Sequence, residues 1–79
     1  MLQALIPQTR TSRTREQALD EAPGRPVVLL RPAPVRVRSI IGHAVAYTVT
    51  HVLVEWESGG ELNVKWEANW LVRRVPQGS

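Results

Sequence analysis

Arginine is the residue type that offers chemistry in quantity in this sequence. Nine of the ten lysine and arginine residues are arginine, and the planar guanidinium binds phosphate and carboxylate groups through two parallel hydrogen bonds. Residues 1–40 hold seven arginines against three acids, a net charge of +4, whereas residues 41–79 hold three cations against four glutamates, a net charge of −1. The basic chemistry therefore belongs mainly to the N-terminal half. A bias toward arginine can also simply reflect GC-rich coding.

The other reactive side chains predict no catalytic or metal site. His43 and His51 are the only histidines, cysteine is absent and no carboxylate stands at metal-ligand spacing. Both are therefore expected to be satisfied or rim histidines and not ligands or bases. Glu55, Glu57 and Glu67 fall on one expected hairpin face that is open to solvent, whereas acid–base catalysis needs carboxylates in a cleft with separated pKa values. We expect a protein that is not an enzyme, with no metal and no cofactor.

The aromatic side chains divide into two expected groups. Trp56 and Trp66 share the inward parity of their strands and are predicted to be core residues, because a small domain needs the large apolar area that each buries. Trp70 lies in a turn, where the pattern favours a cap over the end of the sheet. The alternative is an exposed Trp70 that forms an aromatic platform with Tyr47 and stacks a nucleic-acid base or holds a proline-rich peptide.

A β-hairpin over residues 52–71 organises these side chains. Apolar and polar residues alternate on both sides of Gly59-Gly60, as in half-buried strands. A two-residue turn would place the apolar sets of the two strands on opposite faces. The pattern therefore predicts a loop of three or five residues with a glycine at positive φ, which unites on one face Val52, Val54, Trp56, Leu62, Val64 and Trp66.

Further strands are expected on both sides of this hairpin. Residues 35–38 alternate as a strand with valines inward and arginines outward, and residues 40–42 read as a bend at a glycine. The apolar parity changes at Thr50-His51, which predicts a β-bulge or a tight corner. Residues 68–70 are typical of one 3₁₀ turn, and residues 71–75 of a last strand.

These elements predict a single small all-β domain, a strongly bent antiparallel sheet. Residues 1–26 are expected to be a flexible basic arm, residues 27–76 the β-domain and residues 77–79 a disordered end. Thr14 and Gln17 have capping-box spacing for a short helix over residues 17–22. The expected core comprises Val35, Val37, Ile41, Val45, Tyr47, Val49, Val52, Val54, Trp56, Leu62, Val64, Trp66 and Leu71.

Two further features bound the setting of the protein. Prolines flank Val27–Leu30, which is therefore an edge strand, a docking arm or a contact with a second subunit. No apolar run approaches the roughly 18 residues of a membrane span, so we expect no membrane partner. The absence of cysteine fits a reducing, cytoplasmic compartment.

The order of elements resembles that of SH3-like barrels. The resemblance covers residues 35–75, through VRVRSIIGHAV, then VLVEWESGG, then VKWEANWLVRRV. The spacing is also similar to that of the type II dihydrofolate reductases, which assemble around a Val-Gln-Ile-Tyr segment. The corresponding Leu62–Trp66 stretch lacks the glutamine and the tyrosine, so reductase activity is not implied. Oligomerisation through this strand is an open alternative.

The resemblance to SH3-like barrels implies a binding site, because in that architecture the first and last strands are neighbours. A basic rim is then expected, with Arg25 nearby, made of Arg31, Arg36, Arg38, Arg73 and Arg74. Such a rim would bind another protein or a second copy of the chain, for example through the acidic hairpin face. The alternative is sequence-nonspecific binding of a nucleic-acid backbone.

Overall fold

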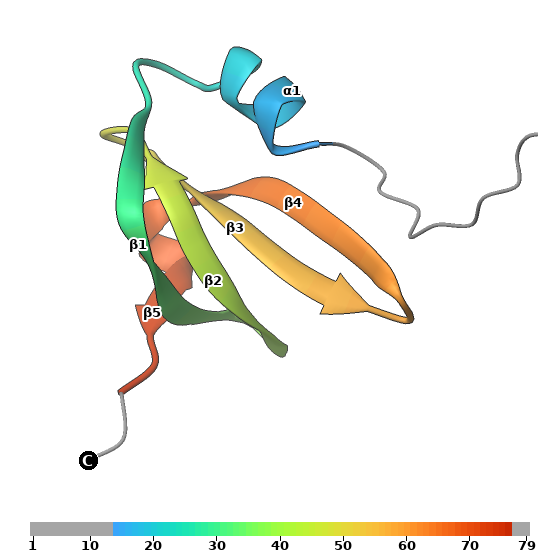
Figure 1. The fold of residues 1–79 in the computed structure, drawn as a ribbon. Coiled ribbons are helices and arrows are strands. Elements are labelled where there is room, and N and C mark those ends of the chain that lie inside the picture. The colour runs from blue at the N-terminus through green and yellow to red at the C-terminus, as the bar shows by residue number, and fades with distance from the viewer. Residues whose placement is uncertain (1–13, 77–79) are drawn as a thin grey trace, which may run out of the picture.

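The computed structural model describes residues 14–76, which form a curled five-stranded antiparallel sheet with one short helix (Figure 1). The strand order is β4-β3-β2-β1-β5, so the sheet is a half-barrel with β4 and β5 at its edges. The fold class predicted from the sequence is thereby confirmed. The elements are α1 (Arg15–Asp20), β1 (Val27–Val37), β2 (Ile40–Tyr47), β3 (His51–Ser58), β4 (Glu61–Ala68), the 3₁₀ helix η1 (Asn69–Leu71) and β5 (Val72–Arg74).

β1 is longer than expected and is interrupted in the middle. Val27 and Val28 pair with the end of β2, and the register then shifts until pairing resumes at Ala33. The proline at position 32 has no N–H to donate, which explains why the ladder is broken there. Val27–Leu30 is therefore part of a strand. Because β5 pairs only with Val35, Arg36 and Val37, this part of β1 has a free edge, which fits the first of the three alternatives.

The turn between β1 and β2 lies two residues earlier than the sequence pattern indicated. Val37 pairs with Ile40 across the two-residue turn Arg38-Ser39, so the bend predicted at residues 40–42 is wrong. Gly42 lies within β2 and is needed for close approach. A Cβ atom there would lie 2.5 Å from the carbonyl oxygen of Glu55 on β3.

The β3–β4 hairpin has a two-residue turn, so the predicted three- or five-residue loop is wrong. Ser58 pairs with Glu61, and Gly59 and Gly60 have φ values of 59° and 81°, the pair of positive angles that a type I′ turn requires. The expectation of positive-φ glycine is confirmed. In this register Leu53 of β3 pairs with Trp66 of β4.

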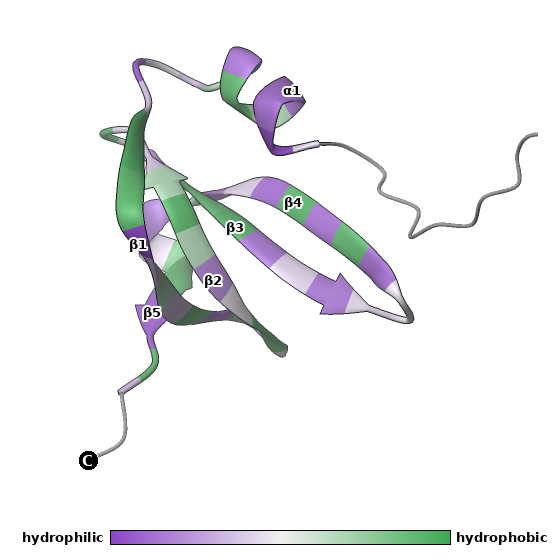
Figure 2. Cartoon of the chain, in the orientation of Figure 1, coloured by the Kyte–Doolittle hydropathy of each residue, from purple (hydrophilic) through white to green (hydrophobic). Residues whose placement is uncertain are grey.

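This register gives the hairpin a buried patch on each face, where the sequence pattern predicted one shared face. Trp56 and Trp66 lie on opposite faces, because Trp66 packs against the first cluster and Trp56 against the second. Figure 2 shows alternating hydrophilic and hydrophobic bands along β4. The first cluster consists of Ala18, Val45, Ala46, Leu53 and Val64, with Leu19 and Trp66 against it. The second consists of Val35, Val37, Ala44 and Val54, flanked by residues that include Leu29, Ala33, Val52, Trp56, Leu71 and Val72.

A bulge in β2 allows both clusters to form. Ala44 pairs with Val54 and Ala46 with Leu53, so Val45 is the extra residue. An extra residue turns the following side chains to the other face, which sends Ala44 to the second cluster and Ala46 to the first. The predicted change of parity therefore occurs at Val45 and not at Thr50-His51, which belong to the β2–β3 turn and the start of β3.

The first cluster is covered by α1, which lies beside β4 in Figure 1. Thr14 and Gln17 form the predicted capping box, and Ala18 is fully buried. The Trp66 Nε1 donates to the carbonyl oxygen of Ala18 at 2.7 Å. The predicted arm of residues 1–26 thus contains a helix that packs on the sheet from residue 15 onward, whereas residues 1–13 of that arm lie outside the described residues, as does the predicted disordered end at residues 77–79.

The core prediction is confirmed for five buried valines: Val35, Val37, Val45, Val54 and Val64. Val52, Trp56, Trp66 and Leu71 are partly buried and pack against the clusters. Four members are wrong, because Ile41, Tyr47, Val49 and Leu62 are exposed. The pattern missed Leu53, Ala44, Ala46 and Ala18, since it assumed a single interior. None of the helices in the described part is long and apolar enough to span a membrane.

A candidate anion-binding surface on β1 and β5

The pairing of β1 with β5 places two arginines directly opposite each other. Arg36 is the Cα partner of Arg73, and on its other side Arg36 is the partner of Ile41 in β2. Directly opposite residues share a face of the sheet, and all three side chains are exposed, Ile41 by 61%. We call these three residues, Arg36, Arg73 and Ile41, the outer basic face.

The strand alternation explains why this face points outward. Val35 and Val37 are buried in the second cluster, so Arg36 between them must face solvent. Arg38 follows in the turn, where it is exposed and has a positive φ of 57°. Such a φ is uncommon for a residue with a Cβ atom.

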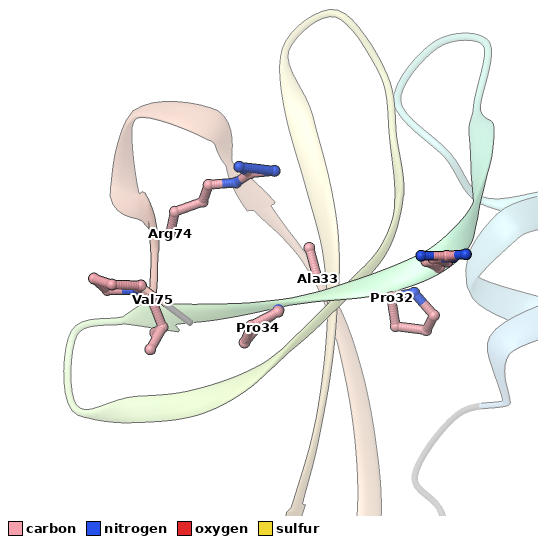
Figure 3. Close-up of a pocket in the computed structure, with 7 residues that line it drawn as sticks. Pro32, Ala33, Pro34, Arg74 and Val75 are labelled. Atoms are coloured by element: carbon pink, nitrogen blue, oxygen red, sulfur yellow. The ribbon is translucent and has the colours of Figure 1, made fainter. Parts of the chain in front are cut away.

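Arg74 and Arg31 do not join the outer basic face. Arg74 is the Cα partner of buried Val35 and therefore lies on the inner side of the sheet. It lines, together with Arg31, a hollow of about 470 Å³ whose other walls are Pro32, Ala33, Pro34, Val75 and Pro76. In Figure 3 Arg74 and Ala33 lie on one side of β1, and Pro32 and Pro34 point to the other. The single rim expected from the sequence is thus divided: Arg36 and Arg73 lie on the outer basic face, whereas Arg31 and Arg74 line the hollow.

A second, more apolar hollow of about 230 Å³ adjoins the first. Its lining includes Leu29, Tyr47, Val52 and Val72, and the two hollows share Ala33 and Arg74. Arg74 is the one charged residue among the residues that line it. An apolar recess with a single guanidinium at its margin suits a ligand that is both apolar and anionic.

The molecule is strongly polarised in charge. Residues 25–47 and 72–76 hold Arg25, Arg31, Arg36, Arg38, Arg73 and Arg74 and no acid, which amounts to +6. Residues 14–24 and 48–71 hold two cations against seven acids, which amounts to −5. None of these six arginines forms a salt bridge or a side-chain hydrogen bond with another residue in the described range 14–76. Their hydrogen-bond donors therefore face solvent.

The two remaining described cations lie next to acids. The guanidinium of Arg15 contacts the Glu55 carboxylate with both Nη2 at 2.8 Å and Nε at 3.3 Å. This hydrogen bond raises the pKa of Arg15. Lys65 Nζ lies 4.0 Å from Glu67, which is only 7% exposed. The predicted solvated face of three glutamates is therefore wrong, because Glu55 supports α1 and Glu67 is buried on the opposite side.

The two aromatic residues of the predicted platform, Trp70 and Tyr47, are both exposed. Trp70 is 73% exposed in η1, so its expected role as a cap is wrong, and Leu71 packs in the second cluster instead. Tyr47 lines the apolar hollow. His43 is exposed, and the His51 Nδ1 lies 2.7 Å from the Thr50 hydroxyl. Residues 14–76 contain no group of three potential metal ligands.

Sequence reasoning missed Ile41 and the proline-lined hollow. The sequence pattern places Ile41 in the expected core, whereas the structure places it opposite Arg36 with 61% of its surface exposed. The prolines at positions 32 and 34, two residues apart beside Arg31, are the sequence signal for the gap in the sheet. Comparison of the chain with protein-family models, with curated proteins and with solved structures gives no match.

Proposed function

We propose that this chain is a non-enzymatic interaction module that binds an acidic protein surface through the outer basic face. The observation that carries the proposal is the pairing of Arg36 with Arg73. Like charges directly opposite each other destabilise a sheet, and no described acid offsets them. An external carboxylate would remove this repulsion.

Ile41 favours a protein partner over a nucleic-acid backbone. Protein interfaces combine arginine with an apolar centre that is shielded from water, and Ile41 lies beside Arg36 and is 61% exposed. A phosphate backbone offers no apolar group for an apolar side chain at this position to contact. The acidic half of a second copy is one candidate for the partner surface.

The order of the elements supports placing the chain among the SH3-like barrels. The first strand pairs with the last, and a 3₁₀ helix precedes the last strand. This architecture hosts binders of several kinds, so it supports a binding role in general and no particular ligand. The ligand class is therefore inferred from the positions of the arginines.

Binding of poly-L-glutamate and of a random-sequence DNA duplex, measured in parallel, tests the proposal. Replacement of Arg36 and Arg73 by glutamine should weaken poly-L-glutamate binding by about tenfold or more, since two charge-assisted hydrogen-bonding groups are lost. Lys65→Gln, which removes a cation from the other half of the molecule, is the control and should change it less than twofold.

Two results would contradict the proposal. One is equal loss of binding in the Lys65 control, which would mean that only net charge matters. The other is tighter binding of DNA than of poly-L-glutamate, with affinity that falls steeply between about 50 and 200 mM salt. That second result would assign the outer basic face to nucleic acid.

A further inference from the structure

We infer that the two adjoining hollows at the end of β5 bind an extended peptide segment in which an aspartate or glutamate neighbours a large apolar residue. The inference rests on the proposed function, because it names the chemistry of a partner segment. It uses Arg31 and Arg74, which line the larger hollow and are not part of the outer basic face.

The larger hollow has the chemistry of a carboxylate site. Arg31 and Arg74 both line it, and its other walls are proline, alanine and valine. Neither guanidinium forms a salt bridge with a described residue. Both arginines are exposed, and Arg74 lies on the other side of β1 from Pro32 and Pro34 (Figure 3). A guanidinium beside apolar residues favours an anion through charge-assisted hydrogen bonds.

The smaller hollow has the size of a side-chain pocket. At about 230 Å³ it lies below the roughly 300–1,000 Å³ typical of pockets for whole small ligands. Leu29, Val52 and Val72 supply most of its apolar lining, and Tyr47 and Asn69 supply polar groups. The Asn69 Nδ2 already donates to the carbonyl oxygen of Val49 at 3.2 Å. The pocket therefore accepts one apolar side chain.

Arg74 joins the two hollows and fixes how close the two ligand groups must be. Arg74 and Ala33 line both, so a carboxylate held by Arg74 lies beside the apolar pocket. An acidic residue and an apolar residue adjacent in one chain satisfy this geometry. A nucleic-acid strand would offer the anion without an aliphatic group to fill the pocket.

The backbone of β1 explains why the ligand should be an extended segment. Leu29, Leu30, Arg31 and Pro32 have no Cα partner in either neighbouring strand, because the β1–β2 register is interrupted there and β5 pairs only with residues 35–37. Leu30 is 99% exposed. Three of these four residues have an N–H, so an added strand could hydrogen-bond along this part of β1.

The test uses the ¹⁵N-labelled full chain and a capped heptapeptide, acetyl-Ser-Gly-Leu-Asp-Leu-Gly-Ser-amide. We expect amide signals of Leu29, Ala33, Val72 and Arg74 to shift on titration, and those of Arg36 and Ile41 to stay in place. A peptide with asparagine for the aspartate, and one with alanine for both leucines, should each bind about tenfold more weakly or worse.

Matched variants separate this site from the outer basic face. Arg74→Gln should weaken heptapeptide binding by about tenfold, whereas Arg36→Gln on the neighbouring strand should change it less than twofold; dispersed spectra confirm that both variants fold. Unchanged binding in Arg74→Gln would overturn the inference, and so would hexanoate binding as tightly as the heptapeptide. If only Arg36→Gln weakened the heptapeptide, this inference would fail and the proposed function would stand.

Discussion

At the scale of single residues, Gly42 shows how closely β2 and β3 pack. A Cβ atom at this position would lie 2.5 Å from the carbonyl oxygen of Glu55 and 3.0 Å from the Cβ of Trp56. Backbone cannot move aside as a flexible side chain would. The glycine is therefore required by the distance between the two strands, not by its own φ.

Gly42→Ala should lower the free energy of unfolding by about 1–3 kcal/mol or more, the usual cost of overpacking. Denaturant-induced unfolding, monitored by tryptophan fluorescence, measures this loss of unfolding free energy. Gly59→Asn is the matched control, because a Cβ atom at Gly59 meets nothing within 4 Å and Asn-Gly is a favoured type I′ pair. Equal destabilisation of the two variants would contradict the clash at Gly42.

Arg38 combines local strain with a candidate binding role. Its φ of 57° is a conformation that costs a side-chain-bearing residue about 1 kcal/mol, and strained residues are concentrated at functional sites. An exposed turn residue with no described ion-pair partner gains nothing evident from being arginine. The strain is consistent with a role in binding.

Arg38→Gly should raise the free energy of unfolding by about 0.5–1 kcal/mol, because glycine relieves the strain but loses more chain entropy on folding. Arg38→Ala keeps the Cβ atom and should leave stability within about 0.5 kcal/mol of the parent. Thermal unfolding of both variants measures these changes in stability. An equal gain in stability in the two variants would show that charge repulsion, not backbone strain, was relieved.

At the scale of elements, α1 is held by few contacts. Ala18 is its buried anchor, the Trp66 indole donates to the Ala18 carbonyl oxygen, and the partly exposed Arg15–Glu55 pair adds little, as surface ion pairs generally do. A helix of six residues is not stable alone in water. Its order therefore depends on these tertiary contacts.

Trp66→Phe keeps an aromatic ring in the first cluster and removes the indole donor. We expect the free energy of unfolding to fall by about 1–2 kcal/mol. Faster amide hydrogen exchange over Arg15–Asp20 should be the first effect observed. Trp70→Phe, which alters an exposed ring with no described hydrogen bond, should leave that exchange unchanged. Protected α1 amides in the Trp66 variant would show that Ala18 burial alone holds the helix.

The elements were predictable from the sequence where local chemistry decides them. The capping box of Thr14 and Gln17, the glycine turn and the 3₁₀ turn before the last strand depend on neighbours in sequence, and the structure has all three. The register was not predictable, because it depends on which faces are buried. Leu53 and Val54 are both buried, and a strand covered on two faces gives no parity signal.

The candidate site was predictable to the same extent. The proximity of Arg36 and Arg73 could be predicted because it depends only on the pairing of the first and last strands. The inward position of Arg74 depends on its pairing with buried Val35, a long-range register that no local pattern specifies. The gap near Pro32 did have a local signal in the prolines at positions 32 and 34. The division of the arginines between two faces therefore could not be predicted from the sequence.

At the scale of the whole molecule, the +6 and −5 halves give the chain a large charge asymmetry. The basic half includes β1, β2 and β5, and the acidic half includes α1, β3 and β4. Opposite charges on different surfaces of one molecule favour head-to-tail contact between copies. Such contact would be weakened by salt, because exposed charges are screened.

Light scattering at two protein concentrations should show an average mass that rises with concentration in about 20 mM salt and falls to the monomer value at about 500 mM. Glu57→Gln with Glu61→Gln, at the exposed hairpin end, should reduce the low-salt association. A strict monomer under all conditions would exclude a second copy as the partner while leaving a foreign acidic surface as the ligand of the outer basic face.

The Gly59-Gly60 turn has a consequence for how this chain tolerates insertions. If the turn kept two residues, one extra residue would enter β4 and exchange its two sides, so that Lys65 and Asn63 would lie under α1 while Val64 and Trp66 moved to the other layer. Two extra residues would restore the arrangement. Insertions that enter β4 should therefore be tolerated when their length is even and should destabilise the domain when it is odd. Residues held in a longer loop that keeps Ser58 opposite Glu61 should leave the register unchanged.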